Sequence, residues 1–225
     1  AEGVGNLAVL LGASTGRDGI GGASVLASAG FQEGSEAKRP SVQVGDPFEE
    51  KKLIEACLEL LDRGLAVGVQ DLGAAGISCA TSETAAKAGN GMDVDIARVA
   101  RREPGMNAVE VMTSESQERM LAIVEPANLD AVLALSARWE VRANVIGVVT
   151  DTGRFRVYDG KFDAGENADA SALAPLADVP VESLGDGPTY HRPMQAPSDL
   201  AQRQADDPGA VLLERFPDGT DLSSE

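Results

Sequence analysis

Aromatic residues, cysteines and histidines are all scarce in this sequence. Phe, Trp and Tyr together make up 4% of the 225 residues, so Ala, Val, Leu and Ile have to fill most of the interior. The two cysteines, Cys57 and Cys79, are expected to be buried free thiols in a reducing compartment. The one histidine, His191, lies far along the chain from the other polar motifs, which makes it a poor candidate for a catalytic base.

Positive charge is also in short supply. There are 19 Lys and Arg residues against 36 Asp and Glu residues, which gives a formal net charge of −17. This charge disfavours nucleic acid and anionic membrane surfaces as partners, and a phosphorylated ligand would need a metal ion or another domain to supply positive charge. No apolar run reaches the ~18 residues of a membrane span, and residues 1–4 lack the features of a signal peptide. We therefore expect a cytoplasmic protein without a nucleic-acid or membrane partner.

The order of apolar patterns favours an α+β fold. Segments 141–150 and 154–158 both read as strands, joined by a compact turn, which breaks a regular strand–helix alternation. We expect a layered α/β domain with a mixed, mostly antiparallel sheet and flanking helices. Asp93 and Asp95 share one face of a predicted strand and are expected to face solvent. The predicted strands are 6–12, 65–69, 92–96, 119–124, 141–150 and 154–158, and helices are predicted at 47–63, within 73–89, and at 108–113 and 126–139.

The C-terminal part of the sequence differs in composition from the rest. Regular patterns end near Lys161, and Ala, Asp, Gly and Pro dominate from Phe162 onward. We therefore expect one domain over residues 1–187. Residues 188–225 read as a linker, partly disordered, that leads toward a missing second half.

The run Arg39-Pro-Ser-Val-Gln-Val-Gly-Asp-Pro-Phe48 joins an extended segment to a strongly patterned helix. Asp46 is placed to cap that helix, and Pro47 fits its first turn. Gln43 is an uncharged amide between two valines just before the helix. Such an amide suits ligand recognition, although it could also satisfy a neighbouring strand.

Two further polar groups stand next to predicted strands. Asp71 ends a strand and precedes Leu72-Gly-Ala-Ala-Gly76, so its carboxylate could hold Mg²⁺, which prefers oxygen ligands, or could cap a helix or turn. Glu115, Ser116 and Gln117 lie between a predicted helix and a predicted strand. They could contact a ligand or form an ordinary exposed loop.

The sequence offers no set of side chains for covalent catalysis. No Ser-His-Asp set, Cys-His pair or zinc cluster can be assembled from it. The glycine-rich segment 12–22 could cradle a phosphate or form a tight structural turn, but it lacks the Lys-Ser or Lys-Thr of a P-loop. From the residues alone, the chain is a ligand-binding α/β domain with a candidate Mg²⁺ ligand, and its catalytic partner lies elsewhere.

Five segments together resemble the phosphoribosylformylglycinamidine synthase family, the large ATP-dependent amidotransferase subunits of purine biosynthesis. The resemblance covers roughly residues 3–193. Its segments are Thr15-Gly-Arg-Asp-Gly-Ile-Gly-Gly-Ala-Ser24, Arg39 to Phe48, Gln70-Asp-Leu-Gly-Ala-Ala-Gly76, Ser114-Glu-Ser-Gln-Glu-Arg-Met120 and Val145-Ile-Gly-Val-Val-Thr-Asp-Thr-Gly-Arg154. Subunits of that family carry two homologous halves, each with an ATP-binding-type domain and a C-terminal domain like that of aminoimidazole ribonucleotide synthetase. By resemblance, this chain is the C-terminal domain of the first half.

The resemblance implies a role for each matching residue. Gln43, Glu115, Ser116 and Gln117 would contact the substrate, formylglycinamide ribonucleotide, and Asp71 would ligate Mg²⁺. The general base and most ATP-binding residues of the family lie outside this sequence, so we assign no catalytic residue and expect the chain alone to be inactive. The resemblance also implies ATP as co-substrate. The implied partners are the rest of the synthase chain, a glutaminase subunit and a small accessory subunit.

Two other interpretations remain open. A sister enzyme such as aminoimidazole ribonucleotide synthetase or thiamine-monophosphate kinase would share the fold, although the strings Ser-Val-Gln-Val-Gly-Asp-Pro and Glu-Ser-Gln-Glu-Arg-Met argue against it. A free-standing ligand-binding or regulatory module would need no catalytic partner. An open reading frame that continues in both directions would exclude that module.

Overall fold

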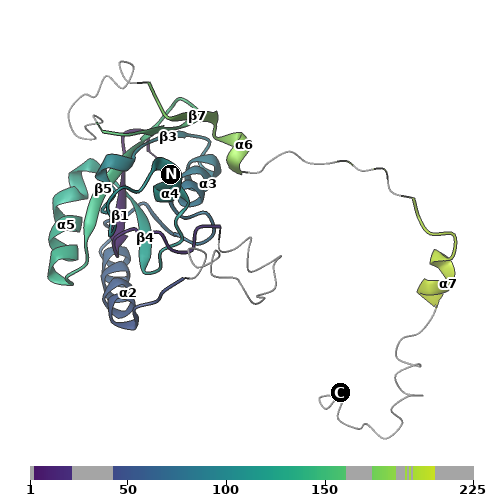
Figure 1. Ribbon diagram of the computed structural model, residues 1–225, viewed down its shortest axis with the longest axis horizontal. Helices are drawn as coiled ribbons and strands as arrows, with labels where there is room; N and C mark the ends of the chain where they lie inside the picture. Colours follow the sequence, from purple (N-terminus) through teal and green to yellow (C-terminus); the bar gives the residue numbers. More distant parts are fainter. Residues whose placement is uncertain are drawn as a thin grey trace, which may run out of the picture. The chain divides into compact units, whose positions relative to one another are not determined.

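A computed structural model describes residues 3–21, 43–160, 174–185, 191, 193 and 195–205 of the chain (Figure 1). The chain divides into two compact units, residues 1–188 and 189–225. In the second unit the described residues include one helix, α7 (Leu200–Ala205). The helices and strands that follow all belong to the first unit. No helix among the described residues is long and apolar enough to cross a membrane.

The first unit is built on one sheet of seven strands, in the order β2-β4-β1-β5-β3-β6-β7. Neighbouring strands are antiparallel except for β3 and β6, which run parallel. The predicted mixed, mostly antiparallel sheet is therefore confirmed. The strands are β1 (Leu7–Gly12), β2 (Gly68–Asp71), β3 (Gly91–Asp95), β4 (Arg119–Val124), β5 (Ala143–Thr150), β6 (Arg154–Tyr158) and β7 (Ala177–Pro180).

Helices cover both faces of the sheet, because side chains alternate along each strand. In β1, Val9 belongs to the apolar core shared with α2 and α5, whereas Leu10 belongs to the core shared with α3 and α4. The short helix α6 lies against α3. The helices are α2 (Pro47–Asp62), α3 (Gly76–Lys87), α4 (Ala108–Thr113), α5 (Leu129–Arg138) and α6 (Glu182–Gly185), with 3₁₀ turns η2 (Ile96–Arg98) and η3 (Pro126–Asn128).

Helix α2 begins where the sequence predicts. Oδ1 of Asp46 accepts hydrogen bonds from the backbone N–H groups of Phe48 at 3.0 Å and Glu49 at 3.2 Å, and Pro47 occupies the first turn. The cap satisfies two of the N–H groups that a helix start leaves without partners. It thereby fixes the point at which the chain leaves the Gln43 segment and enters the helix.

Strand β3 does not follow the prediction that its acidic residues face solvent. Asp93 and Asp95 are each 2% exposed. The carboxylate of Asp93 accepts hydrogen bonds from Nε and Nη2 of Arg156 at 2.7 and 2.8 Å. Oδ1 of Asp95 accepts from the backbone N–H groups of Ala97 and Gly160, both at 3.0 Å. The prediction was wrong because β3 lies inside the sheet, between β5 and β6, where both carboxylates find partners.

The sheet also extends further along the chain than predicted. β7 pairs antiparallel with β6, beyond the expected end of regular structure near Lys161. With four residues and a proline, β7 is too short to give a periodic signal in the sequence.

Candidate functional site

Glu115 joins two segments that the sequence marks separately. It stands between α4 and β4 and is 2% exposed. One of its carboxylate oxygens accepts a hydrogen bond from Nε2 of Gln43 at 3.0 Å, and the other accepts from the backbone N–H of Ala75 at 3.0 Å. Ala75 belongs to the loop that follows Asp71 at the end of β2. Three segments that are distant in the sequence therefore meet at one carboxylate.

The four predicted substrate residues differ in accessibility. Gln43 is exposed and Gln117 is half-buried. Nε2 of Gln117 donates to the backbone carbonyl of Glu115 at 2.8 Å. Ser116 is 1% exposed, and Glu115 is similarly enclosed. The two amides are therefore the more accessible groups, whereas the side chain of Glu115 is enclosed by protein and Ser116 is almost fully buried at the edge of the groove beside Asp71.

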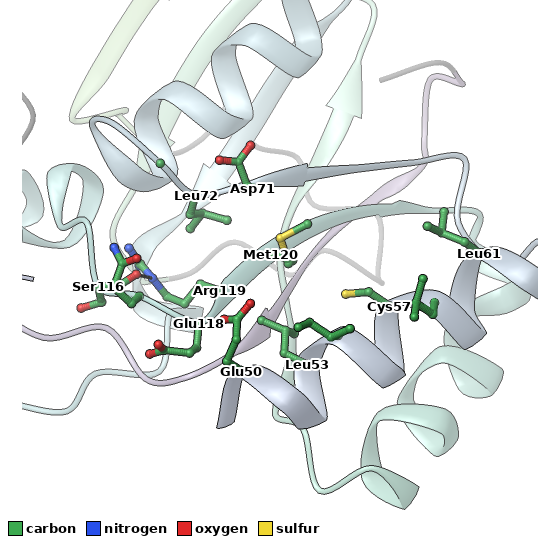
Figure 2. Close-up of a pocket in the computed structure, with 14 residues that line it drawn as sticks. Glu50, Leu53, Cys57, Leu61, Asp71, Leu72, Ser116, Glu118, Arg119 and Met120 are labelled. Atoms are coloured by element: carbon green, nitrogen blue, oxygen red, sulfur yellow. Dashed lines mark hydrogen bonds between the residues drawn. The ribbon is translucent and has the colours of Figure 1, made fainter. Parts of the chain in front are cut away.

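Asp71 lies at the end of β2, beside a groove between α2 and strands β2 and β4 (Figure 2). Its carboxylate is exposed, and Oδ1 accepts a hydrogen bond from Nε2 of Gln70 at 2.8 Å. Glu50 of α2 and Glu118 line the same groove, which has a volume of about 380 Å³. Two of the predicted substrate residues also line it, Ser116 and Gln117. Three carboxylates and two predicted substrate residues therefore border one groove.

The carboxylates suit a hard cation such as Mg²⁺, but they do not form a complete protein cage. Within the described ranges, no group of three or more His, Cys, Asp or Glu side chains is placed to hold a metal ion. In proteins Mg²⁺ often binds through one or two carboxylates and completes its coordination with waters and substrate phosphates. Asp71, with its exposed carboxylate, fits that pattern as a single protein ligand.

Beyond Glu50 at the start of the helix, the α2 wall of the groove is mainly apolar. Ile54, Leu58 and Leu61 line it, and they are 43%, 54% and 51% exposed. Their spacing places them along one side of the helix, next to the face that packs on the sheet. The groove therefore combines a mainly apolar α2 wall with Glu50 at its end and with acidic and amide groups on the β2 and β4 side.

The two cysteines are free thiols, as predicted, and both are half-buried. Burial raises the pKa of the Cys57 thiol to about 11, with a smaller contribution from the charge of Glu50. Burial also raises the pKa of Cys79 to about 11, and its thiol donates to Glu83 Oε1 at 2.9 Å, which favours the neutral form. Because the thiolate is the nucleophile, neither cysteine is activated for covalent catalysis at neutral pH.

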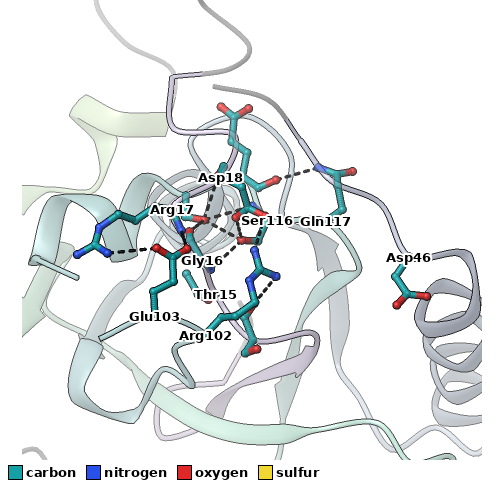
Figure 3. A network of polar contacts seen from close by, with 12 residues as sticks. Thr15, Gly16, Arg17, Asp18, Asp46, Arg102, Glu103, Ser116 and Gln117 are labelled. Carbon is teal, nitrogen blue, oxygen red and sulfur yellow. Dashed lines mark hydrogen bonds and ion pairs between the residues drawn. The ribbon is translucent and has the colours of Figure 1, made fainter. Parts of the chain in front are cut away.

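A buried polar network ties Ser116 to the loop that follows β1 (Figure 3). The Ser116 hydroxyl donates to Oδ1 of Asp18 and accepts from the backbone N–H of Gly16 at 2.9 Å. Oδ2 of Asp18 pairs with the guanidinium of Arg102. Asp18 is 7% exposed, so its two oxygens are directed into the protein.

Arg119 is the buried cation of this network and is 3% exposed. Its Nε donates to the Ser116 carbonyl at 2.8 Å, its Nη2 to the Ser114 carbonyl at 2.6 Å, and its Nη1 to Oγ1 of Thr15 at 2.9 Å. Burial lowers the pKa of the Arg119 guanidinium to about 10, and the charge of Asp18 opposes this shift. Neither Arg119 nor Asp18 was predicted from the sequence as a site residue. Both lie inside segments quoted for the family resemblance, and no other signal in the sequence marked them.

The glycine-rich segment after β1 acts as a structural turn in its described part. The N–H groups of Gly16 and Arg17 donate to side-chain oxygens of the protein, at 2.9 and 2.8 Å, so they are not directed at a phosphate. Gly19 has φ of +64°, and a Cβ added there would lie 2.5 Å from Cβ of Glu115. The turn therefore packs directly against the residue at which the site segments meet.

The family described as AIR synthase related protein, C-terminal domain, matches residues 3–160 of the chain. This chain belongs to that family. The match covers most of the sheet and all of the site residues described above.

Two similar proteins are each called phosphoribosylformylglycinamidine synthase subunit PurL. The protein from Thermobifida fusca is 53% identical over 94% of this chain, and that from Parafrankia sp. is 56% identical over 97%. The matched parts make up 27% and 28% of those two proteins. The chain therefore spans only a part of the length of these relatives.

Among solved structures, the chain is similar to Thermotoga maritima PurL complexed with FGAR, with a TM-score of 0.71 and 37% sequence identity. The similarity covers 88% of this chain and 31% of that chain. Other structures of T. maritima PurL hold ATP or ADP, and one is the structure of PurLQS. The layered fold predicted from the apolar patterns is thus confirmed for this member of the AIR synthase related family.

Proposed function

We propose that this chain is one domain of a phosphoribosylformylglycinamidine synthase. This ligase converts formylglycinamide ribonucleotide, with ATP and glutamine-derived ammonia, to formylglycinamidine ribonucleotide in purine biosynthesis. The observation that carries the proposal is the meeting of three polar segments at Glu115, in a chain whose named relatives are subunits of that synthase. In this proposal residues 1–187 are the C-terminal domain of the first half, and residues 188–225 link it to a second half.

Gln43 and Gln117 are proposed to contact the substrate through their amides. A neutral amide can both donate and accept hydrogen bonds, so it can orient a formamide group without adding charge. Because Nε2 of Gln43 donates to Glu115, the amide is held in one orientation while its oxygen can accept from a substrate N–H. Glu115 and Ser116 belong to the same proposed contacting segment, and Glu115 holds both amides, Gln43 through its carboxylate and Gln117 through its backbone carbonyl.

Asp71 is proposed to ligate Mg²⁺ together with oxygen atoms of the bound substrates. When bound, the ion would neutralise part of the phosphate charge of ATP. The exposed position of Asp71 beside the groove supports this role. The net charge of −17 makes such neutralisation necessary, because the domain itself repels phosphates.

The contribution of this domain to the chemistry is binding and positioning. In the proposed reaction ATP phosphorylates the formamide oxygen of the substrate, and ammonia then displaces phosphate from the resulting iminophosphate. Holding the reacting groups in one geometry removes much of the entropic barrier of such a step. The general base and most ATP contacts would come from other domains, so we expect the 225-residue chain alone to be inactive.

The proposed partners follow from the same assignment. They are the remaining synthase polypeptide, a glutaminase subunit and a small accessory subunit, and the solved T. maritima PurLQS structure supports such an assembly. We propose a cytoplasmic location, where purine biosynthesis takes place.

The function can be tested in the full-length polypeptide that contains this chain. The assay follows formation of formylglycinamidine ribonucleotide with ATP, Mg²⁺ and ammonia, for wild type, Gln43→Ala, Asp71→Asn and the control Asp130→Asn. Asp130 is an exposed carboxylate on α5, so its loss tests the effect of charge alone. We expect wild-type turnover, unchanged kinetics in the control and a loss of at least ~10-fold in kcat/KM in the two site variants. Turnover with unaffected Gln43→Ala and Asp71→Asn variants would remove the residue roles, and a folded wild type without turnover would remove the function.

A further inference from the structure

The buried network that holds residues 114–117, the Glu115 segment, is more polar than a stable core requires. Thr15, Asp18, Ser114, Ser116 and Arg119 are all at most 7% exposed. Burying such groups costs free energy unless each finds partners, and a well-packed apolar core is often at least as stable. A fully bonded polar network does, however, restrict the chain to one arrangement. The network is therefore better suited to holding residues 114–117 in one conformation than to stabilising the fold.

Arg119 fixes the backbone on both sides of Glu115. Its guanidinium donates to the carbonyls of Ser114 at 2.6 Å and Ser116 at 2.8 Å, which are the residues directly before and after Glu115. A third bond, to Oγ1 of Thr15 at 2.9 Å, anchors the guanidinium to the loop after β1. The forked, planar geometry of arginine allows these three bonds at once, and a lysine ammonium could not span the three acceptors.

Asp18, in the loop that follows β1, holds residues 114–117 as well. Its side chain accepts from the hydroxyl of Ser116, and its backbone carbonyl accepts from the N–H of Glu115 at 3.1 Å. The pair with Arg102 keeps its other carboxylate oxygen occupied. The carboxylate of Asp18 is thus committed to the protein and is not available for a ligand.

We propose that Arg119 and Asp18 are positioning residues that set the direction of the Glu115 carboxylate and the Gln117 amide for substrate binding. The inference rests on the function proposed above. Arg119 borders the groove of Figure 2, but Nε, Nη1 and Nη2 of its guanidinium all donate to protein acceptors, and Asp18 is 7% exposed with both carboxylate oxygens paired. Neither residue is therefore assigned a direct contact with the substrate.

Arg119 acts through the carbonyls of Ser114 and Ser116, and Asp18 acts through the Ser116 hydroxyl and the Glu115 N–H. The Glu115 carboxylate, held in this way, fixes the Gln43 amide through their hydrogen bond.

The test uses the full-length synthase polypeptide with the variants Arg119→Lys and Thr15→Val. The lysine keeps the charge but loses the fork. Thr15→Val keeps the shape of the side chain and removes Oγ1, the acceptor of one Arg119 hydrogen bond. It therefore tests the same network if Arg119→Lys does not fold. Two measurements are made for each variant: the kinetics with each substrate varied in turn, and the hydrogen–deuterium exchange of the Glu115 and Ser116 amides. We expect kcat/KM for formylglycinamide ribonucleotide to fall about 10-fold or more in Arg119→Lys, with less change in KM for ATP, and the two amides to exchange faster.

Arg17→Lys is the matched control, because Arg17 lies in the same loop as Thr15. Its guanidinium pairs instead with Glu103 at 3.2 Å and Glu110 at 3.0 Å, and it makes no bond to residues 114–117. We expect the control to change neither the kinetics nor the exchange of the Glu115 and Ser116 amides.

The outcomes separate this inference from the proposed function. Wild-type turnover with unaffected variants, or equal losses for every substrate together with a large drop in thermal stability, would overturn the positioning role. A wild type that is folded but does not use formylglycinamide ribonucleotide would overturn the proposed function. In that case the link to substrate binding would be overturned with the function, and the exchange would decide what remains: unchanged exchange at Glu115 and Ser116 in Arg119→Lys would overturn the ordering of residues 114–117 by Arg119, and faster exchange would support it.

Discussion

Gly19 is the residue at which backbone conformation and the site are most directly linked. Its φ is +64°, and a Cβ added there would lie 2.5 Å from Cβ of Glu115, 3.0 Å from the Glu115 carbonyl oxygen and 3.1 Å from Cγ of Gln43. Gly21 has nearly the same φ, +65°, but a Cβ added there would meet no atom within 4 Å in the part of the chain that the structure describes. The two glycines therefore differ in the space around them and not in their backbone conformation.

This pair separates backbone strain from contact with the site. We expect Gly19→Ala and Gly21→Ala both to lose about 1 kcal/mol of stability, because a side chain disfavours positive φ. Gly19→Ala should lose about 1–3 kcal/mol more, because Glu115 and its backbone must shift. Urea denaturation of the 225-residue chain measures the difference. Equal losses in the two variants would show that Gly19 is required for its backbone conformation alone.

At the scale of elements, the start of α2 depends on one side chain. Asp46 accepts hydrogen bonds from the backbone N–H groups of Phe48 and Glu49, at 3.0 and 3.2 Å, and its negative charge also faces the positive end of the helix. Asp46→Ala removes both effects, whereas Asp46→Asn keeps an acceptor oxygen and removes the charge. We expect the alanine variant to lose about 1 kcal/mol of stability and the asparagine variant less than half of that. Denaturation midpoints at low and high salt distinguish the hydrogen-bond contribution from the charge contribution. Equal losses of stability in Asp46→Ala and Asp46→Asn at low salt would assign the effect to charge.

The elements that sequence patterns predict well are those with one buried face. Helix α2 shows helical spacing of apolar residues between a cap and Gly64, and the sequence locates it within a residue or two. Strand β3 was predicted correctly, but Asp93 and Asp95 were wrongly predicted to be exposed. An alternation of apolar and acidic residues normally indicates that the acidic side chains face solvent. The strand is covered on both sides, and Arg156 from the parallel neighbour β6 neutralises Asp93. A single sequence does not contain that pairing.

The same limit applies to the candidate site of the whole molecule. The resemblance named Gln43, Asp71 and the Glu115 segment, but no pattern in the sequence states that Gln43 and Glu115 lie within hydrogen-bond distance. Arg119 begins a strand and Asp18 lies in a glycine-rich loop, and charged residues at such positions are usually exposed. Their burial follows from tertiary contacts between residues about one hundred positions apart in the sequence, such as Thr15 and Arg119. The network that organises the site was therefore beyond reach of sequence patterns.

Two properties of the whole molecule act against each other in solution. Ile54, Leu58 and Leu61 form an exposed apolar strip on α2 beside the groove, which favours contact with another apolar surface. The net charge of −17 makes copies of the chain repel one another. Salt screens the repulsion, with a Debye length that falls from ~30 Å at ~0.01 M to ~8 Å at ~0.15 M, and leaves the apolar attraction in place.

We therefore expect the 225-residue chain to be monomeric at low salt and to self-associate weakly as salt is raised, as measured by sedimentation equilibrium. Leu58→Lys should abolish the association with little loss of stability, since Leu58 is 54% exposed. The matched control is Val109→Lys, which places the same charge on α4 at another apolar residue, 68% exposed. It should leave the association almost unchanged, because one added charge alters the net charge only slightly. Equal effects of the two lysines would show that net charge governs the association, and a wild type that stays monomeric at high salt would show that the α2 strip does not drive contact between copies.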